Sequence, residues 1–341
     1  MRRTAAAVLA ALALTGTAAC STETTPSGGS AGKTTDDCGY AFVHAATIGS
    51  SLFEQWAEDG VKRARTDLGV KIDSVESATP PAIADNFRAF AQQKCKKVIA
   101  SVGFTAAEAM TQVAKEFPDQ QFAIIDAEVA LPNVRSYTWA VEEATYVAGV
   151  AAAKLSRSGT IGAVFGMDIP PLKRWQAGYE EGAKAVNPDV KVLVNYVGSF
   201  SDPAKALTLA IAQKQQGADI ILPASGSNLG IISDSVKNDF SVVAIDPDEA
   251  TKAGEAGVLF TMQQKVADSV ILLFRESQDT GAEGGTRDLR LRDDVFAFDP
   301  FTTTSGRFAG KVPPEVTEAV KQAYDDIVAG RVVVRNPLAG Q

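Results

Sequence analysis

Short apolar runs alternate with longer segments of helical period through most of this 341-residue chain, and the alternation limits the folds open to it. The runs are rich in Val, Ile and Phe, a composition typical of strands buried on both faces. We expect strands at AFVHAA, VKIDSV, KKVIASV, FAIIDA, VRSYTW, TIGAVF, VKVLVNYV, DIILPAS, SVVAID and GVLFTM. Strands separated by helices predict parallel sheets that are covered by helices on both faces.

The segments between these runs carry apolar residues at the spacing of one helix face. In the first such segment they are Phe53, Trp56, Ala57, Gly60, Val61, Ala64 and Leu68. Spacings of three and four residues predict an amphipathic helix. Similar faces occur at 83–95, 106–117, 146–155, 171–186, 204–216, 230–237, 266–277 and 314–328.

So many strands rarely form one open sheet, so we divide the series between two α/β lobes. We expect the N-terminal lobe to comprise 38–140 plus 263–292, and the C-terminal lobe 141–262 plus 293–341, with three chain crossings between them. Two such lobes form a cleft, and ligands of parallel sheets bind beyond the carboxyl ends of the strands.

Residues 1–19 have the pattern of a signal peptide, because Arg2 and Arg3 precede an apolar run that ends in small residues. The run is about half of the ~20 residues that a membrane-spanning helix needs. Cys20 follows where a signal peptidase would cut, and the site resembles a bacterial lipobox, although Thr17 stands where that pattern usually has Leu. We expect lipid on Cys20, a flexible tether over 20–37, and an exported chain anchored on the outer face of the bacterial cytoplasmic membrane.

Two further cysteines, Cys38 and Cys95, each lie just before an expected strand. An even number of remaining cysteines in an exported chain favours a disulfide. If the two strands are parallel neighbours, their starts adjoin and a bridge fits. The alternative is a pair of buried free thiols.

The formal charge of -8 offers no basic surface for phosphates, so we expect no nucleic-acid partner. With a single histidine, His44, the chain has no usual set of zinc ligands, and we expect neither a metal nor another cofactor. His44 lies inside the first strand, where a buried, hydrogen-bonded ring is the expected state. Glu142 and Glu143 are expected to form a solvated helix start.

Small residues, carboxylates and aromatic rings follow the expected strands. The segments concerned are 47–53, 103–105, Asp126, 166–168, 198–202, 225–228 and 246–248. Rings can stack on planar groups, and carboxylates accept hydrogen bonds from amines and hydroxyls. Structural roles remain open, since Phe53 can pack in the core and Asp126 or Asp246 can cap a following helix or turn.

The segments GSSLFEQWAEDG, FAIIDA, GMDIP and YVGSFSDPAKA resemble the basic membrane protein family, and the similarity extends from about Tyr40 to Pro337. Its members are substrate-binding lipoproteins of ABC importers, purine nucleoside receptors among them. The resemblance implies a type I periplasmic-binding-protein fold, with two doubly wound parallel-sheet lobes joined by a three-crossing hinge.

The resemblance also implies a binding site. By motif position, Phe53 and Phe200 correspond to rings that clamp a base, and Asp126 to the carboxylate that reads it. Asp246 and Lys265 correspond to the pair that holds ribose hydroxyls, and Gly226 to a backbone contact.

The first loop departs from the family pattern, which usually reads Asp-Lys-Ser-Phe-Asn where this chain has Ser50-Ser51-Leu52-Phe53-Glu54. The family's Asn bonds the ligand, so Glu54 in its place puts the nucleoside in question. We include Ser50 and Ser51 in the expected site. Phe104 and Trp175 are added as rim or wall residues, for which packing in the core is the alternative.

We therefore expect a monomeric receptor that binds a small polar ligand and delivers it to an ABC permease. A nucleoside is the expected ligand. It is not expected to be an enzyme. A nucleoside-processing enzyme using Asp126 or Asp246 is one alternative, and a sensor that presents its ligand to a membrane partner is another.

Overall fold

The computed structural model describes residues 38–49, 52–226, 228–281, 283–299 and 310–339. The expected signal peptide, Cys20 and the tether lie outside the described residues, as do Ser50 and Ser51. Asp36–Gln341 form one compact unit, which holds two six-stranded sheets. Within the described ranges, none of the helices combines the length and apolarity needed to span a bilayer.

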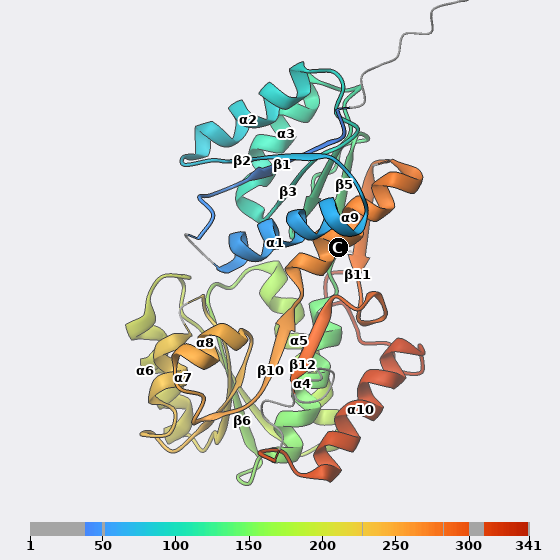
Figure 1. Ribbon diagram of the computed structural model, residues 1–341. Coiled ribbons are helices and arrows are strands. Elements are labelled where there is room, and N and C mark those ends of the chain that lie inside the picture. Colours follow the sequence, from blue (N-terminus) through green and yellow to red (C-terminus); the bar gives the residue numbers. More distant parts are fainter. Residues whose placement is uncertain (1–37, 50–51, 227, 282, 300–309, 340–341) are drawn as a thin grey trace, which may run out of the picture. The chain divides into compact units, whose positions relative to one another are not determined.

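The first sheet has the strand order β11-β5-β4-β3-β1-β2, and all its neighbours are parallel. Its strands are β1 (Tyr40–His44), β2 (Ile72–Glu76), β3 (Ile99–Val102), β4 (Phe122–Ile125), β5 (Val134–Trp139) and β11 (Gly285–Leu289). Helices α2 (Pro80–Gln92) and α3 (Ala107–Glu116) cover one face, and α1 (Leu52–Asp67) and α9 (Val266–Thr280) cover the other (Figure 1). A short 3₁₀ turn, Phe104–Ala106, precedes α3.

Strand β1 shows why this sheet is apolar throughout. Phe42 packs with the residues of α1 and α9, whereas Ala41 and Val43 pack with those of α2 and α3. Successive side chains of a strand point to opposite faces, so a strand covered on both sides needs an unbroken apolar run.

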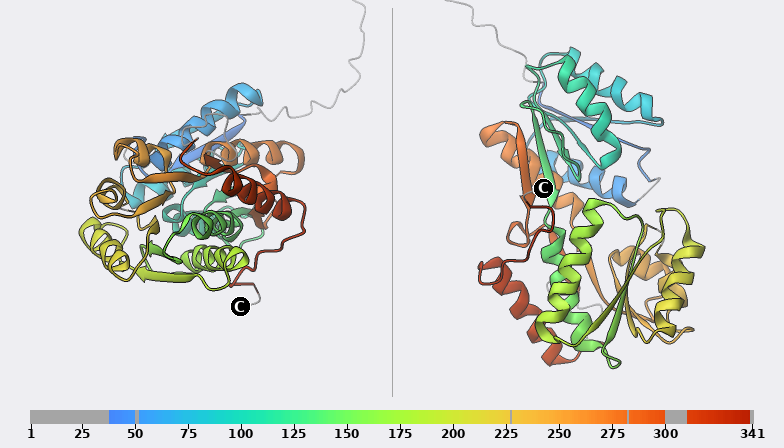
Figure 2. Two further views of the ribbon diagram at one scale, coloured as in Figure 1. Left: turned by 90° about the horizontal axis from the view of Figure 1, so that it is seen from below. Right: turned by 180° about the vertical axis from the view of Figure 1, so that it is seen from behind.

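The second sheet has the order β12-β10-β9-β8-β6-β7, with β12 antiparallel to β10 and the other neighbours parallel. Its strands are β6 (Thr160–Phe165), β7 (Lys191–Tyr196), β8 (Ile220–Ala224), β9 (Ser241–Ala244), β10 (Val258–Gln264) and β12 (Phe296–Asp299). One face packs on α6 (Pro203–Gln215), α7 (Leu229–Asp234) and α8 (Pro247–Lys252). The other packs on α4 (Val141–Leu155), α5 (Pro170–Val186) and α10 (Pro314–Val328) (Figure 2).

Helices α4 and α5 pack closely because glycines line their contact. A Cβ atom on Gly182 would lie 2.0 Å from the Tyr146 carbonyl oxygen, and one on Gly178 would lie 2.1 Å from that of Glu142. From the other helix, a Cβ on Gly149 would lie 2.2 Å from the Tyr179 carbonyl oxygen. No larger residue fits at these three positions unless the helices move apart.

The chain passes between the two sheets at three places: from β5 into α4, from β10 into α9, and from β11 through the 3₁₀ turn Leu291–Asp293 into β12. The predicted α/β architecture with two mainly parallel sheets is confirmed. Each expected apolar run contains a strand, but β11, β12 and α8 were not predicted. The sequence of β11, GTRDL, has no apolar run, because this strand lies at the edge of its sheet.

Cys38 and Cys95 form a disulfide with 5.6 Å between their Cα atoms. They precede β1 and β3, which are parallel neighbours in the first sheet. The bridge therefore joins the two strands at their amino-terminal ends.

Candidate ligand-binding site

A cavity of about 230 Å³ lies at the carboxyl ends of the strands. Its lining residues are Phe53, Trp56, Gly226, Asn228, Ile245, Asp246, Glu249, Gln264 and Val266. Phe53 and Trp56 come from α1, Gly226 and Asn228 follow β8, and Gln264 and Val266 lie where β10 leads into α9. Residues that belong to both sheets and their covering helices thus line one cavity.

A larger cavity of about 810 Å³ lies at the opposite, amino-terminal edge of the second sheet, beside Asp219, Ile220 and Ser241. Ligands of parallel sheets bind beyond the carboxyl ends of the strands. Position relative to the strands, rather than volume, therefore identifies the smaller cavity as the candidate site.

The two aromatic residues of the cavity are one helical turn apart on α1. Phe53 packs edge-on against Trp139, with 6.3 Å between the ring centroids, and it is only partly buried. Trp56 was not singled out as a site residue from the sequence. Its position three residues after Phe53 was the available signal, because residues at this spacing share a helix face.

Phe200 packs against glycine backbone beside the cavity. A Cβ atom on Gly166 would lie 2.3 Å from Cδ1 of the Phe200 ring, and one on Gly226 would lie 2.8 Å from the Phe200 carbonyl oxygen. Gly226 also has φ 74°, a value that other residues rarely adopt. The structure thus brings Phe200 next to Gly226, which lines the cavity, although Phe200 itself is not among the described lining residues.

Asp246 both lines the cavity and caps a helix. Its Oδ1 accepts hydrogen bonds from the backbone N–H groups of Asp248 at 2.7 Å and Glu249 at 3.2 Å, at the start of α8. Burial raises the pKa of Asp246, and it also raises that of Glu249. The capping role that the sequence left open is therefore present.

Asn228 and Glu249 are further cavity residues that the sequence analysis missed. Asn228 donates to Glu249 Oε2 at 3.0 Å and accepts from the backbone N–H of Ser225 at 2.9 Å. This chain of hydrogen bonds connects the end of β8 to α8. Glu249 lies on α8, which was not predicted from the sequence. Because that helix is only six residues long, it is too short to show a helical period.

Asp126 follows β4 in a left-handed conformation with φ 66°. Its backbone N–H donates to the Tyr137 carbonyl at 2.8 Å. The side chain is accessible to solvent, yet surrounding protein desolvates it and raises the pKa of Asp126 to about 7. A strained backbone is common in ligand sites, but Asp126 is not among the described residues that line the cavity.

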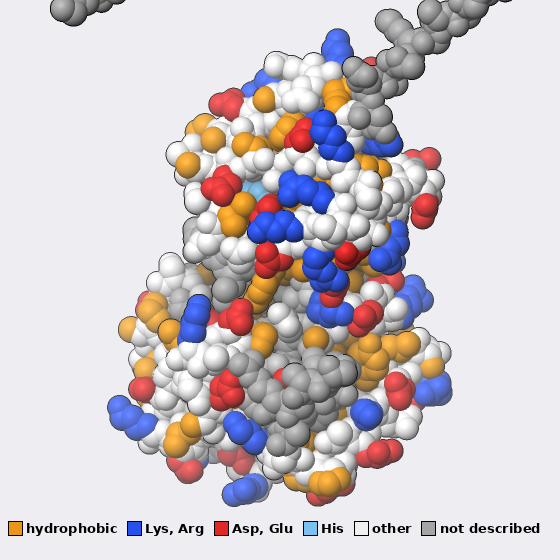
Figure 3. Space-filling view, viewed as in Figure 1, with side chains coloured by type: hydrophobic (Ala, Val, Ile, Leu, Met, Phe, Trp, Pro, Cys, Tyr) orange, Lys and Arg blue, Asp and Glu red, His pale blue; other side chains and the backbone are white. Residues whose placement is uncertain are grey.

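Three expected site residues have other surroundings. Phe104 is 68% exposed at the end of β3, and Trp175 is buried on α5 within the core. Lys265 forms ion pairs with Asp268 at 2.9 Å and Asp294 at 3.1 Å. Acidic and basic side chains lie side by side over α1 and α9 in Figure 3, where the Arg63–Asp268 pair at 2.8 Å joins the two helices.

Three glutamates discussed from the sequence, Glu54, Glu142 and Glu143, are buried. Glu54 points to His44, with 2.9 Å between Oε2 and Nδ1, so its carboxylate is engaged away from the cavity. The expectation that Glu142 and Glu143 form a solvated helix start is wrong. Both are buried, because Arg174 and Arg290 from distant parts of the sequence pair with them.

Comparison with known proteins gives relatives along most of the chain. The ABC transporter nucleoside-binding protein BmpA of Lactococcus lactis subsp. cremoris is 29% identical over 90% of this chain and 91% of its own length. An uncharacterised lipoprotein of Pyrococcus horikoshii is 28% identical over 82% of this chain and 75% of its own.

A solved solute-binding protein of an ABC transporter system from Aeropyrum pernix K1 has the same fold, with a TM-score of 0.67 and 22% identity over 89% of this chain and 94% of its own. Residues 39–327 match the family described as ABC transporter substrate-binding protein PnrA-like. The match includes both sheets and the cavity between their strand ends. The chain therefore belongs to the Bmp family of PnrA-like ABC transporter substrate-binding proteins.

Proposed function

We propose that this substrate-binding protein captures a nucleoside between two lobes, comprising 38–140 plus 263–292 and 141–262 plus 293–341, which close about the three chain crossings. The observation that carries the proposal is the cavity itself, where Phe53 and Trp56 meet Asp246 and Glu249. Rings stack on a base, and carboxylates accept hydrogen bonds from hydroxyls and amines. The name of the Lactococcus relative points to the same ligand class.

In this proposal Phe53 and Phe200 hold the base, Asp126 reads its polar edge, and Gly226 offers backbone groups. Asp246 accepts from the sugar hydroxyls. Lys265, just before α9, is assigned to the sugar end of the site, where its ion pairs with Asp268 and Asp294 offset its positive charge. Phe104 is assigned to the rim, since it is 68% exposed.

Mild denaturation first removes any ligand that co-purifies with the protein, and mass spectrometry identifies that ligand. Calorimetry of the ligand-free protein with adenosine, guanosine, inosine and uridine then tests the proposal. We expect one site per chain. Phe200→Ala should weaken binding by about tenfold or more, since base stacking contributes about 1–3 kcal/mol. Asp126→Ala should weaken it by a similar factor, since a hydrogen bond to a charged group contributes about 1.5–3 kcal/mol. Unchanged affinity in both variants would remove the proposed site.

Binding without turnover is also part of the proposal. The enzyme alternative predicts release of free base from a nucleoside incubated with the protein, whereas a receptor returns the nucleoside intact. Chromatography of the incubated mixture separates the two outcomes. The sensor alternative shares the binding step and differs in its membrane partner, which pull-down with the permease would identify.

We further propose that the chain is exported and lipid-anchored through Cys20, with the ABC permease as its partner at the outer face of the membrane. Relatives of this chain are named as lipoproteins and basic membrane proteins. Metabolic labelling with a fatty acid should mark the wild-type protein, and Cys20→Ala should abolish the label and release the protein from the membrane fraction.

A further inference from the structure

His44 lies between two buried carboxylates. It ends β1 and is fully buried, with Nδ1 2.9 Å from Glu54 Oε2 and Nε2 3.1 Å from Glu58 Oε2. Both glutamates belong to α1 and are less than a tenth exposed. Each ring nitrogen therefore has a carboxylate at hydrogen-bond distance.

These two contacts limit where the hydrogen-bond donors can lie, because each joins a ring nitrogen to a carboxylate oxygen. A neutral imidazole has one N–H donor, and its other nitrogen carries a lone pair. That lone pair would face a carboxylate oxygen at close range, which is unfavourable in a buried site. An imidazolium donates from both nitrogens and satisfies both carboxylates.

We propose that His44 is an imidazolium at neutral pH and acts as a positioning residue, which holds the first two turns of α1 so that Phe53 and Trp56 face the ligand cavity. Glu54 follows Phe53 directly, and Glu58 lies two residues after Trp56. The two rings face the cavity while the two acids face β1. Two bonds to one ring therefore fix the rotation of the helix about its axis.

Two further charged side chains near His44, Arg65 and Lys62, lie close to the Glu58 carboxylate. Its Oε1 lies 3.7 Å from Arg65 Nη1 and 4.0 Å from Lys62 Nζ. On the neighbouring strands, Glu76 of β2 pairs in register with His44 and is exposed, and β3 has no charged residue. On its own strand, the ring of Phe42 lies 4.8 Å from the His44 ring.

Helix α9 packs against α1 on the same side of the sheet. Its charged residues are Asp268, Arg275, Glu276 and Asp279, with Lys265 just before it. Asp268 pairs with Arg63 and Lys265, and Glu276 accepts a hydrogen bond from the Tyr137 hydroxyl at 3.0 Å. The carboxylates that contact the ring at hydrogen-bond distance are thus those of α1.

Because the chain has a single histidine, nitrogen NMR of untagged protein labelled with ¹⁵N-histidine reports this ring alone. At pH 7 the wild type should give two signals of a protonated imidazolium. In Glu58→Gln the amide can donate to the unprotonated nitrogen, so a neutral ring keeps both bonds and should give one protonated and one unprotonated signal. A neutral ring in the wild type at pH 7 would overturn the proposal.

The matched control is Glu76→Gln, which removes a nearby charge without touching the ring. It should leave the imidazolium signals in place. If Glu76→Gln neutralises the ring as Glu58→Gln does, the field of the surface and not the two bonds sets its charge, and the proposal is wrong. Since Glu58→Gln retains the size and polarity of the side chain, it tests the idea even if variants of His44 itself fail to fold.

Positioning is tested without ligand through the indole N–H signal of Trp56, assigned with Trp56→Phe. In the wild type this signal should shift with the same pH midpoint as His44, and in Glu58→Gln it should not follow pH. An indole signal that ignores the His44 titration in the wild type would refute positioning.

The consequence for binding rests on the proposed function. The Kd of adenosine should rise by about tenfold as the wild type loses the His44 proton, the scale of one charged hydrogen bond, and it should stay flat in Glu58→Gln. Failure of every nucleoside to bind would refute the function but leave both NMR outcomes standing. A flat wild-type profile with tight adenosine binding would refute positioning alone.

Discussion

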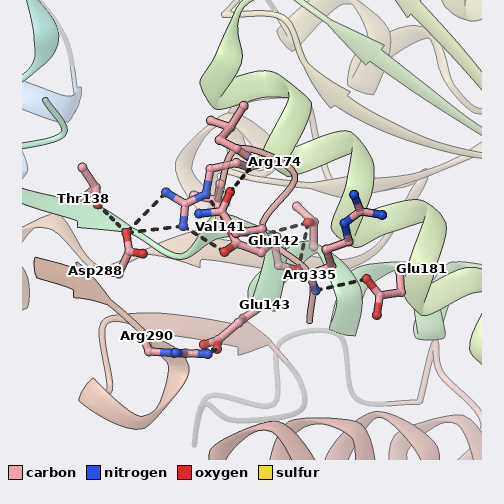
Figure 4. A network of polar contacts seen from close by, with 12 residues as sticks. Thr138, Val141, Glu142, Glu143, Arg174, Glu181, Asp288, Arg290 and Arg335 are labelled. Atoms are coloured by element: carbon pink, nitrogen blue, oxygen red, sulfur yellow. Dashed lines mark hydrogen bonds and ion pairs between the residues drawn. The ribbon is translucent and has the colours of Figure 1, made fainter. Parts of the chain in front are cut away.

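Arg174 of α5 donates two hydrogen bonds to Glu142 at the start of α4, from Nε at 2.6 Å and from Nη2 at 2.9 Å. The same guanidinium lies 3.3 Å from Asp288 of β11, which belongs to the first sheet (Figure 4). Next along α4, Glu143 accepts from Arg290 and, at 3.0 Å, from the backbone N–H of Leu291. Glu143 thus attaches the start of α4 to the chain crossing that follows β11, and Glu142 attaches it to α5.

Replacing Arg174 with Met should lower the free energy of unfolding by about 3–5 kcal/mol, because the buried Glu142 carboxylate loses its partner. Urea denaturation measures the change. The matched control is Arg331→Met on the Arg331–Asp326 pair, whose arginine side chain is 59% exposed. An exposed pair contributes about 1 kcal/mol or less. Equal losses in the two variants would contradict the role given to the buried pair.

Asp126 should make the ligand-free protein less stable as pH rises. Its pKa in the folded protein is about 7, against 3.8 for an ordinary aspartate, so folding favours the protonated form. The resulting stabilisation is fully present below about pH 4 and is lost as pH rises towards 7. Asp126→Asn should therefore raise the melting temperature at pH 8 relative to wild type and leave it unchanged at pH 4. If the difference in melting temperature between Asp126→Asn and wild type were the same at both pH values, Asp126 would not be desolvated.

The sheets could be predicted from the sequence because buried parallel strands need continuous apolar runs. Phe42 and Val43 lie next to each other in β1 and face opposite cores, so both must be apolar. Strand β11 escapes the same logic. It pairs with β5 at the edge of the sheet, so exposed residues such as Asp288 are tolerated there.

The charges could not be placed from the sequence, because their partners are distant along the chain. Glu143 is buried only because Arg290 meets it across 147 residues. The position of Glu54 in the first loop could not show that the structure turns this side chain towards His44. Spacing along one helix reveals a face, but it does not reveal which groups another element brings to that face.

The contact between α4 and α5 should not tolerate a methyl group. Gly182→Ala places Cβ near the Tyr146 carbonyl oxygen, where the available distance is 2.0 Å, so the helices must separate. Overpacking of this kind costs about 1–3 kcal/mol. The control is Gly230→Ala in α7, where a Cβ meets nothing within 4 Å and alanine should stabilise the helix slightly. Thermal unfolding of both variants measures the difference, and a neutral Gly182→Ala would contradict the close packing.

The charge of the cavity should exclude phosphorylated ligands. Among the described residues that line it, Asp246 and Glu249 are acidic and none is basic. A phosphate brought beside two carboxylates is repelled, so AMP should bind at least about tenfold more weakly than adenosine, equivalent to about 1.4 kcal/mol. Repulsion between accessible charges is screened by salt, so the gap should narrow as ionic strength rises.

Glu249→Gln sharpens this test, because it removes one negative charge while the amide keeps an oxygen that can accept from Asn228. In the variant the ratio of the Kd of AMP to the Kd of adenosine should fall, whatever the change in adenosine binding itself. Calorimetry with AMP and adenosine at low and high salt measures the ratio of their Kd values for the wild type and for the variant. If AMP binds the wild type as tightly as adenosine does, the carboxylates do not select against phosphate, and the ligand must approach the cavity with its phosphate directed away from Asp246.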